Sequence, residues 1–267
     1  MIEPLRSLLI LNTDGDSYAK AVRGKFPGLH VRPTTDRAEA LKWLPEFEAL
    51  AASALWVDDA MLRAGARLRW LHALTSGTDT VEASPMLRPE LILTSSKGAQ
   101  GPQMSELALM LMMALGRNLP AMLQNQRERR WIRWPQPLLL GRRVLLVGIG
   151  HISRLLAGKC KAMGMHVTGI TSSPAPVEGF DAVLGRSQLA EAAAQADFVV
   201  VLAAHDAGTH HLVGAEVLRA MRPSACLINL ARGGVIDEQA LIEALRSHAI
   251  AGAALDVFNV EPLPQDS

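Results

Sequence analysis

Short apolar runs alternate with amphipathic segments along most of the 267 residues, and this alternation constrains the fold more than any other feature. In the first half, the runs that predict strands are Leu8–Leu11, Leu29–Val31, Ala49–Ala52, Trp70–Ala73 and Leu91–Thr94, and helical patterns fall at 17–25, 36–44 and 58–64. Two parallel strands need a connection long enough to hold a helix, so the alternation predicts a parallel sheet with helices on its faces. Residues 1–98 are therefore predicted to form a small α/β domain.

The same alternation resumes at Arg143 with more strongly apolar strands. The predicted strands are Val144–Val147, His166–Ile170, Ala182–Leu184, Phe198–Leu202, Cys226–Leu230 and Ala251–Leu255, with helices at 151–163, 187–195, 214–221 and 237–247. A chain of 267 residues is long for one open-sheet domain and comfortable for two. We therefore predict an α/β fold with two Rossmann-like or flavodoxin-like domains and parallel sheets. The second domain is predicted to span 141–267.

The segment 99–140 is predicted to form helices that cross from one domain to the other. Its first helix, Gln103–Arg117, is apolar nearly all round, so it must be covered on most sides by core, by a domain interface or by a second subunit. A polar, arginine-rich helix is predicted to follow over Gln124–Arg133. The longest apolar run, Leu107–Leu115, has nine residues, well short of the ~20 that span a bilayer.

Charge and cysteine content restrict the possible partners. The formal net charge is +1, from 27 basic and 26 acidic residues, so no overall field attracts nucleic acid or an anionic membrane. The two cysteines, Cys160 and Cys226, lie far apart in the sequence and outside any metal-ligand spacing. We therefore expect both to be buried in the core of a protein that works in a reducing compartment. The N-terminal sequence lacks the pattern of a signal peptide. We therefore expect a cytoplasmic protein with a small-molecule partner, without a metal site and without nucleic acid or membrane as a partner.

A glycine-rich turn follows the first strand of the second domain. The strand Val144–Val147 leads into Gly148-Ile149-Gly150-His151-Ile152-Ser153, and helical sequence comes next. Gly148 would permit the tight bend, Gly150 would let the backbone approach a pyrophosphate, and the helix N-terminus would offer free N–H groups. Ser153 stands where a third glycine is usual, so the pattern is incomplete although the side chain is small. The turn predicts a dinucleotide site, and a glycine turn without a ligand is the alternative.

The end of the next strand bears on the choice of cofactor. An acidic residue about 20 positions after the glycines would bind the ribose 2′-hydroxyl of NAD. Here the strand ends near Thr171, followed by Ser172 and Ser173, and no carboxylate is present at this point. Hydroxyl donors without a repelling charge favour a 2′-phosphate, although no arginine occupies the usual place. NADP is therefore the preferred prediction and NAD the alternative.

Charged residues follow two later strands, at the edge where open α/β sheets bind ligands. Arg232 follows the strand 226–230, and Asp256 follows the last strand. Asp237 is instead predicted to cap the next helix, and Glu106 to anchor the helix 103–117. The complete set of predicted cofactor-binding residues is Gly148, Gly150, His151, Ile152, Thr171, Ser172, Ser173, Ala203, Leu230 and Asp256.

Five segments, in this order, resemble the D-isomer-specific 2-hydroxyacid dehydrogenase family. Leu74-Thr75-Ser76-Gly77-Thr78-Asp79 resembles its substrate loop, and Met104-Ser105-Glu106-Leu107-Ala108 resembles the start of its crossover helix. The glycine turn at 148–153 and the two segments 229–238 and 252–264 complete the resemblance, which covers most of the chain. It implies an NAD(P)-dependent oxidoreductase that interconverts a small 2-keto acid, of the glyoxylate or hydroxypyruvate type, and its D-2-hydroxy acid by hydride transfer.

The resemblance also implies residue roles. Arg232 would be catalytic and substrate-binding, because a guanidinium can hold the carboxylate and polarise the keto oxygen of the substrate. The backbone N–H groups of Ser76 and Gly77 would bind the far side of the same carboxylate. Residues 1–98 would then be the substrate (catalytic) domain, with the ligand cleft between the two domains. Asp256 would accept from the nicotinamide carboxamide. Glu261 would also be catalytic, because it would orient a catalytic histidine and raise the pKa of that histidine. The alternatives are a surface ion pair for Arg232, a turn-forming role for Asp256 and a solvated loop position for Glu261.

The sequence departs from the family at its end. The family's catalytic histidine lies beyond the Glu-Pro motif, and the sequence ends at Ser267, so we expect the histidine, the closing strand of the sheet and the return helix to be absent. We interpret the chain as a shortened form of a longer enzyme, with His205 as a weak substitute for the histidine. The alternative function is a catalytically impaired or non-catalytic dinucleotide-binding protein. The family and the apolar helix 103–117 both imply a homodimer.

Overall fold

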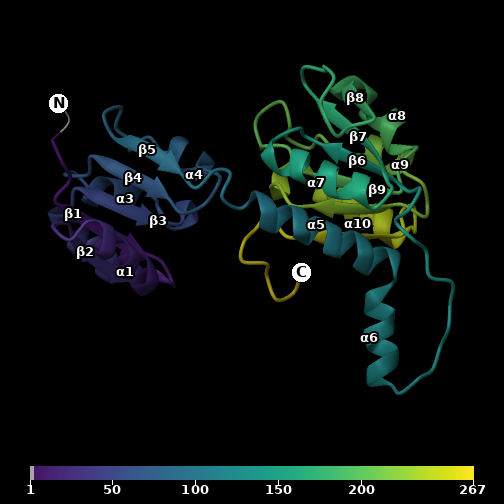
Figure 1. The fold of residues 1–267 in the computed structure, drawn as a ribbon, viewed down its shortest axis with the longest axis horizontal. Helices are drawn as coiled ribbons and strands as arrows, with labels where there is room; N and C mark the ends of the chain where they lie inside the picture. Colours follow the sequence, from purple (N-terminus) through teal and green to yellow (C-terminus); the bar gives the residue numbers. More distant parts are fainter. Residues whose placement is uncertain (1–2) are drawn as a thin grey trace. The chain divides into compact units, whose positions relative to one another are not determined.

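The computed structural model describes residues 3–267 and divides into two compact units, one ending at Gln100 and the other spanning Gly101–Ser267. In the first unit, five parallel strands form one sheet in the order β2-β1-β3-β4-β5 (Figure 1). The strands are β1 Ser7–Leu11, β2 His30–Thr34, β3 Ala49–Ala52, β4 Trp70–Ala73 and β5 Ile92–Ser95. The helices are α1 Gly15–Lys25, α2 Arg37–Trp43, α3 Asp59–Ala64 and the short α4 Asp79–Glu82.

Side chains on both faces of this sheet are buried, as expected for a parallel sheet that helices cover. Leu8 and Ile10 of β1 face one side and pack with Ala19 of α1. The alternate residues Leu9 and Leu11 face the other side and join the cluster that contains α2 and α3. The near-continuous apolar runs of the sequence are thus explained by burial on two faces.

In the second unit, six parallel strands form a sheet in the order β11-β10-β9-β6-β7-β8. The strands are β6 Arg143–Val147, β7 His166–Thr171, β8 Ala182–Gly185, β9 Phe198–Val201, β10 Cys226–Asn229 and β11 Gly252–Leu255. Counted from β6, this is the strand order of the dinucleotide-binding fold. The chain first adds β7 and β8 on one side of β6 and then adds β9, β10 and β11 on its other side, so the strand order reverses between β6 and β9. The predicted α/β class with two parallel sheets is confirmed.

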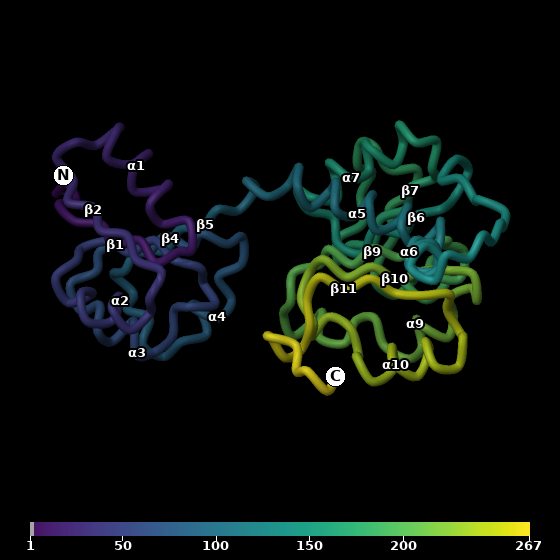
Figure 2. Tube along the Cα trace, turned by 90° about the horizontal axis from the view of Figure 1, so that it is seen from below, coloured from purple at the N-terminus to yellow at the C-terminus, as the bar shows by residue number. Residues whose placement is uncertain are grey.

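Helices cover both faces of the second sheet. α5 Gly101–Gly116 and α7 His151–Ala162 lie on one face (Figure 2). α8 Leu189–Ala193, α9 Ala215–Ala220 and α10 Glu238–Arg246 lie on the other. This is the doubly wound arrangement that the alternation of strands and helices predicts.

Both cysteines are buried, as predicted. Burial raises the pKa of the Cys160 thiol to about 12 and that of the Cys226 thiol to about 11. Both thiols are therefore protonated at neutral pH, and neither has the thiolate character of a nucleophile.

The segment predicted as an inter-domain crossover lies in the second unit from Gly101 onward. α5 packs along α7 and buries only one side, with Ser105, Ala108 and Met112 inside. Met110 and Met113 on α5 are 54% and 43% exposed. The expectation that this helix is covered on most sides is therefore not met within the single chain.

The following helix lies earlier in the sequence than predicted, because α6 spans Leu119–Arg127 rather than 124–133. Pro120 in the first turn favours a helix start at this point, and Arg129 has a φ of 54°, which ends the helical path. No side chain of α6 is buried, and the helix extends away from the layers of the second unit (Figure 1). Within residues 3–267, no single helix is long and apolar enough to cross a membrane; α5 and α6 reach that length only as a pair bent by 63°.

Candidate functional site

The carboxyl ends of the six strands of the second unit lie along one edge of its sheet, because all six strands are parallel. We call this the carboxyl edge. Every residue of this unit that the sequence analysis assigned to cofactor or substrate lies at or just beyond one of these ends. The prediction from strand ends therefore gathers these residues at one edge.

Gly148 begins the turn after β6 with a φ of 97°, which glycine adopts without steric cost. A Cβ at this position would lie 2.6 Å from the backbone N and Cα of Ala203, the residue that leads away from β9. The Gly148 N–H donates to the carbonyl oxygen of Ile170 in β7 at 2.9 Å. Ala203 and Leu230 are only 9% and 6% exposed, so each could offer a ligand little more than its backbone.

The N-terminus of α7 has no side-chain cap. Its N-cap is Gly150, and a Cβ added to Gly150 would meet nothing within 4 Å, so the space in front of the helix is open. The buried Ser153 donates its hydroxyl to the carbonyl oxygen of Gly148. Ser153, which departs from the glycine pattern, thus bonds to the backbone at the start of the turn and leaves the N-terminus of α7 open to an anion.

His151 and Ile152 form the start of α7. The exposed ring of His151 lies over the first residue of α5, where a Cβ on Gly101 would come within 2.5 Å of the ring. Ile152 is half-buried beside it. Their cofactor-binding roles stay predictions.

Hydroxyl side chains mark the end of β7. Thr171 is the last residue of the strand, and Ser172 and Ser173 beyond it are exposed. The next carboxylate along the sequence is that of Glu178. A ribose or phosphate at this end of β7 would therefore meet hydroxyl groups before any acidic residue of this segment.

Arg232 lies in a turn that Asn229 holds in shape. Asn229 is 1% exposed; its Nδ2 donates to the Arg232 carbonyl oxygen at 3.0 Å, and its Oδ1 accepts from the Ala231 N–H at 3.0 Å. The Arg232 side chain is exposed, and its Nη1 donates to the Ala231 carbonyl oxygen at 2.8 Å. Asn229 is not among the site residues predicted from the sequence, although an amide that ends an otherwise apolar strand could have indicated it.

The segment after β11 packs on the same turn. A Cβ on Gly233 would come within 2.2 Å of the Phe258 backbone, and the Asp256 N–H donates to the carbonyl oxygen of the last residue of β10 at 3.0 Å. Burial raises the pKa of the Asp256 carboxyl, and the nearby charge of Glu261 raises it further. Glu261 Oε1 accepts from the Phe258 N–H at 2.8 Å. Asp256 and Glu261 are thus brought together beside the turn that carries the arginine.

Two structural roles predicted from the sequence are confirmed. The Asp237 side chain accepts from the Ala240 N–H at 3.1 Å and caps α10. Glu106 of α5 pairs with Lys159 of α7 at 3.1 Å. Neither residue is needed to explain the chemistry of the carboxyl edge.

His205 lies beside the turn after β10, because a Cβ on Gly234 would be 2.7 Å from its Nε2. The same nitrogen lies 3.3 Å from Nδ1 of His210, whose ring stacks on His211 with 3.9 Å between ring centroids. In the part of the chain that the structure describes, no three His, Cys, Asp or Glu side chains are grouped so that they could hold a metal ion.

The predicted substrate residues Ser76 and Gly77 lie between β4 and α4 of the first unit. The loop is braced by three bonds: Thr75 Oγ1 to the Gly77 carbonyl oxygen at 2.9 Å, the Ser96 N–H to the Thr75 carbonyl oxygen at 3.1 Å, and Ser76 Oγ to Gln100 Oε1 at 3.0 Å. Within residues 3–267, the N–H groups of Ser76 and Gly77 donate no hydrogen bond. The loop therefore keeps two backbone donors that suit an anion.

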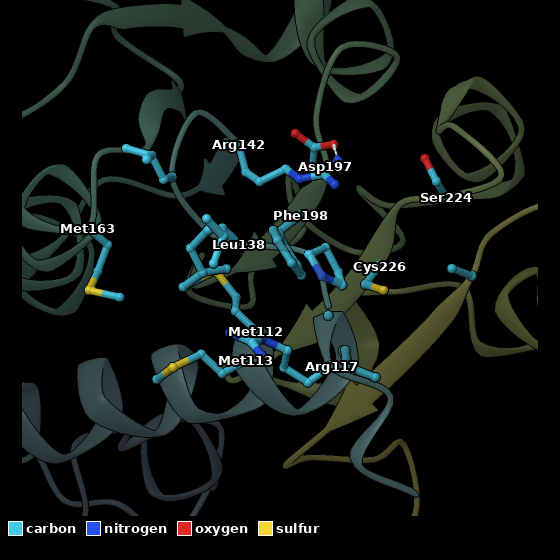
Figure 3. Close-up of a pocket in the computed structure, with 16 residues that line it drawn as sticks. Met112, Met113, Arg117, Leu138, Arg142, Met163, Asp197, Phe198, Ser224 and Cys226 are labelled. Atoms are coloured by element: carbon cyan, nitrogen blue, oxygen red, sulfur yellow. Dashed lines mark hydrogen bonds and ion pairs between the residues drawn. The ribbon is translucent and has the colours of Figure 1, made fainter. Parts of the chain in front are cut away.

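A cavity of about 570 Å³ lies at the opposite edge of the second sheet (Figure 3). Phe198 and Cys226, which line it, are the first residues of β9 and β10. Met112 of α5 and Leu138 add apolar walls. The cavity therefore opens at the amino ends of the strands and is separate from the carboxyl edge.

Comparison with known proteins agrees with this geometry. The family model for the NAD binding domain of D-isomer specific 2-hydroxyacid dehydrogenases matches residues 109–267. D-3-phosphoglycerate dehydrogenase from Synechocystis sp. is 32% identical over 243 residues, which are 87% of this chain and 43% of that protein. Glyoxylate reductase from Korarchaeum cryptofilum is 31% identical over 218 residues, which are 79% of this chain and 65% of that protein. The chain thus spans less than two thirds of the length of either relative.

Two solved structures are similar over almost the whole chain. A D-isomer specific 2-hydroxyacid dehydrogenase family protein from Aeromonas salmonicida subsp. salmonicida is 33% identical, with a TM-score of 0.91 and coverage of 99% of this chain and 85% of that chain. A D-isomer specific 2-hydroxyacid dehydrogenase from Xanthobacter autotrophicus, in complex with NADPH and MES, is 28% identical, with a TM-score of 0.81 and coverage of 99% and 84%. Since the family model alone covers more than half of the residues, the chain belongs to the D-isomer specific 2-hydroxyacid dehydrogenase family.

Proposed function

We propose that the protein is an NAD(P)-dependent oxidoreductase that interconverts a small 2-keto acid, of the glyoxylate or hydroxypyruvate type, and its D-2-hydroxy acid. The observation that carries the proposal is that a dinucleotide-type glycine turn after β6 and an exposed arginine after β10 lie on one sheet edge. Open α/β sheets bind ligands at this edge. The similar glyoxylate reductase from Korarchaeum cryptofilum supports the keto-acid class, and the similar D-3-phosphoglycerate dehydrogenase makes a phosphorylated 2-hydroxy acid the near alternative.

The glycine turn fits a dinucleotide pyrophosphate. The open space at Gly150 admits the phosphates, and the uncapped N–H groups of α7 would bind them. Ser172 and Ser173 would face the adenosine ribose, with NADP preferred to NAD because no carboxylate stands there. Asp256 would accept from the nicotinamide carboxamide. When bound, the cofactor supplies the hydride that the keto carbon takes up.

Arg232 would bind the substrate. Its guanidinium can donate two parallel hydrogen bonds to a carboxylate and keto oxygen, and its charge would stabilise the negative charge that develops on the keto oxygen. Asn229 is a positioning residue, because it fixes the backbone of the turn on which Arg232 stands.

The test is turnover of NADPH with glyoxylate or hydroxypyruvate, followed by the nicotinamide absorbance and by chiral analysis of the hydroxy acid. Arg232→Gln is expected to lower kcat/KM by about 10²- to 10³-fold, as loss of a transition-state donor does, and to leave the Kd of NADPH unchanged. Loss of cofactor affinity in step with turnover would assign Arg232 a structural role instead.

A second candidate is a dinucleotide-binding protein without turnover. The observation that favours it is that no histidine among residues 3–267 is bonded to Glu261, the carboxylate expected to orient an acid–base histidine. The Oε1 atom of Glu261 accepts from the Phe258 N–H instead. NADPH binding with no oxidation by any 2-keto acid would select this candidate. Formation of the D-hydroxy acid would reject it.

We further propose that the protein is a homodimer of the cytoplasm. The surface formed by α5, α6 and the segment after them exposes apolar side chains, with Met110, Leu123 and Trp131 at 54%, 46% and 90% exposure. A second copy would remove this surface from water. Light scattering after size-exclusion chromatography is expected to give twice the chain mass, and Leu123→Glu to give monomers. A wild-type monomer at all concentrations would contradict the proposal. Cell fractionation tests the location.

A further inference from the structure

A cation just beyond the carboxyl end of β8, the strand beside β7, bears on the choice of cofactor. β8 pairs with β7 in a parallel register that ends with Thr171 opposite Gly185, so Arg186 is the first residue beyond the carboxyl end of β8. Neighbouring strands are about 4.8 Å apart. The Arg186 backbone therefore leaves the carboxyl edge one strand spacing from the segment that holds Ser172 and Ser173.

Contacts on two sides keep Arg186 at this edge. Its Nη1 donates to the carbonyl oxygen of Gly208 at 3.1 Å, in the loop that follows β9. In the sheet, β7 and β6 separate β8 from β9, so this bond links loops from two strands that are not neighbours. On the β7 side, a Cβ on Gly185 would lie 4.0 Å from the ring of Pro174, so the residues after β7 stay beside the start of the Arg186 segment.

The charges around Arg186 leave its guanidinium available to an anion. Among residues 3–267, no carboxylate lies within ion-pair distance of it. Asp206 stands on the facing loop, where its Oδ1 accepts from the Gly208 N–H at 2.7 Å and from the Thr209 hydroxyl at 3.3 Å. A guanidinium has five N–H donors, and the bond to Gly208 uses only one nitrogen of the three.

We propose that Arg186, with the hydroxyl groups of Ser172 and Ser173, forms the site for the 2′-phosphate of NADP. The chain would then select its cofactor with a cation that follows β8, whereas the segment after β7 is the usual place for it. This assignment rests on the proposed function, because it concerns specificity within the same dinucleotide site. A phosphate dianion gains charge-assisted hydrogen bonds from a guanidinium, whereas the 2′-hydroxyl of NAD finds no carboxylate acceptor between Thr171 and Val177.

The test is calorimetric titration of the chain with NADPH and with NADH in the absence of a keto acid. The wild type is expected to bind NADPH more tightly. Arg186→Gln is expected to weaken NADPH binding by about 10-fold or more, the worth of a hydrogen bond to a charged group, and to change NADH binding by less than about 2-fold.

The matched control is Arg222→Gln. Arg222 Nε also donates to a backbone carbonyl oxygen, that of Ala194, at 3.1 Å. This bond lies at the opposite edge of the sheet, because Ala194 precedes β9 and Arg222 precedes β10. Neither affinity is expected to change in the control.

Equal weakening of NADPH and NADH binding would overturn the assignment, because a loop-bracing or adenine-stacking role affects both cofactors alike. Unchanged NADPH affinity in Arg186→Gln would overturn it as well. A wild type that binds NADH and not NADPH would overturn it and leave the proposed oxidoreductase intact, whereas binding of neither cofactor would contradict both. Ionic strength gives a second readout. NADPH affinity is expected to fall more steeply with salt than NADH affinity, and Arg186→Gln to remove most of the difference.

Discussion

Two glycines of one turn differ in what a side chain would meet. At Gly148 the φ of 97° and the backbone of Ala203 exclude a Cβ, whereas a Cβ on Gly150 faces open space. Gly148→Ala is expected to lower the free energy of unfolding by about 1–3 kcal/mol. Gly150→Ala is expected to change it by less than about 0.5 kcal/mol and still to weaken dinucleotide binding, because the methyl group occupies the space proposed for the pyrophosphate. Urea unfolding and cofactor titration separate the two effects, and unchanged affinity in Gly150→Ala would contradict the proposed place of the pyrophosphate.

The carboxyl of Asp256 makes stability depend on pH. Its pKa in the folded protein is above the usual value, first because of burial and second because of the charge of Glu261. A raised pKa means that the folded chain binds this proton more tightly than the unfolded chain, so stability falls as pH rises from the ordinary to the raised pKa. Asp256→Asn is therefore expected to gain stability relative to the wild type at neutral pH and to lose that gain in acid. Urea unfolding at several pH values measures this, and a difference that does not vary with pH would refute it.

At the scale of elements, the cap of α10 offers a change that should affect stability and not the site. Asp237→Ala removes the acceptor of the Ala240 N–H and is expected to cost about 1 kcal/mol of unfolding free energy. Asp237→Asn keeps a side-chain oxygen and is expected to retain most of that stability. Thermal unfolding of both variants provides the measurement, with NADPH affinity as the control. A drop in affinity for Asp237→Asn at full stability would show that the residue acts on the site.

The elements that the sequence predicted well are those that burial shapes on two faces. β3 was predicted with its observed bounds, because apolar residues fill both sides of this central strand. β4 was also predicted with its observed bounds, although only Leu71 and Ala73 on one of its faces are buried. The edge strand β2 continues to Thr34. Its predicted end was Val31, because the exposed Arg32 and the half-buried Pro33 interrupt the apolar pattern. α6 was misplaced because none of its side chains is buried, so no periodicity marks it.

The carboxyl-edge residues could be predicted because a strand end fixes the edge on which the next residue lies. The contacts among these residues could not be predicted in the same way. The bonds of Asn229 to its turn, the His151 ring over Gly101 and the bond of Arg186 to the Gly208 carbonyl oxygen depend on side-chain and loop directions. No periodicity encodes such directions, so the sequence alone indicates which groups share an edge and leaves their pairing open.

For the whole molecule, the two units have separate hydrophobic cores, so a ligand that binds one unit should stabilise that unit first. By mass action, a ligand at 100 times its Kd adds about 2.7 kcal/mol to the stability of the part that binds it. NADPH alone is therefore expected to slow amide hydrogen exchange in β6, β7 and β9 and to leave β1 and β3 unchanged, because the proposed dinucleotide site belongs to the second unit. Hydrogen exchange followed by peptide mass spectrometry resolves these strands, and Gly150→Ala, with its weakened binding, is the control. Equal protection of both units by NADPH alone would show that the dinucleotide is not held by the second unit by itself.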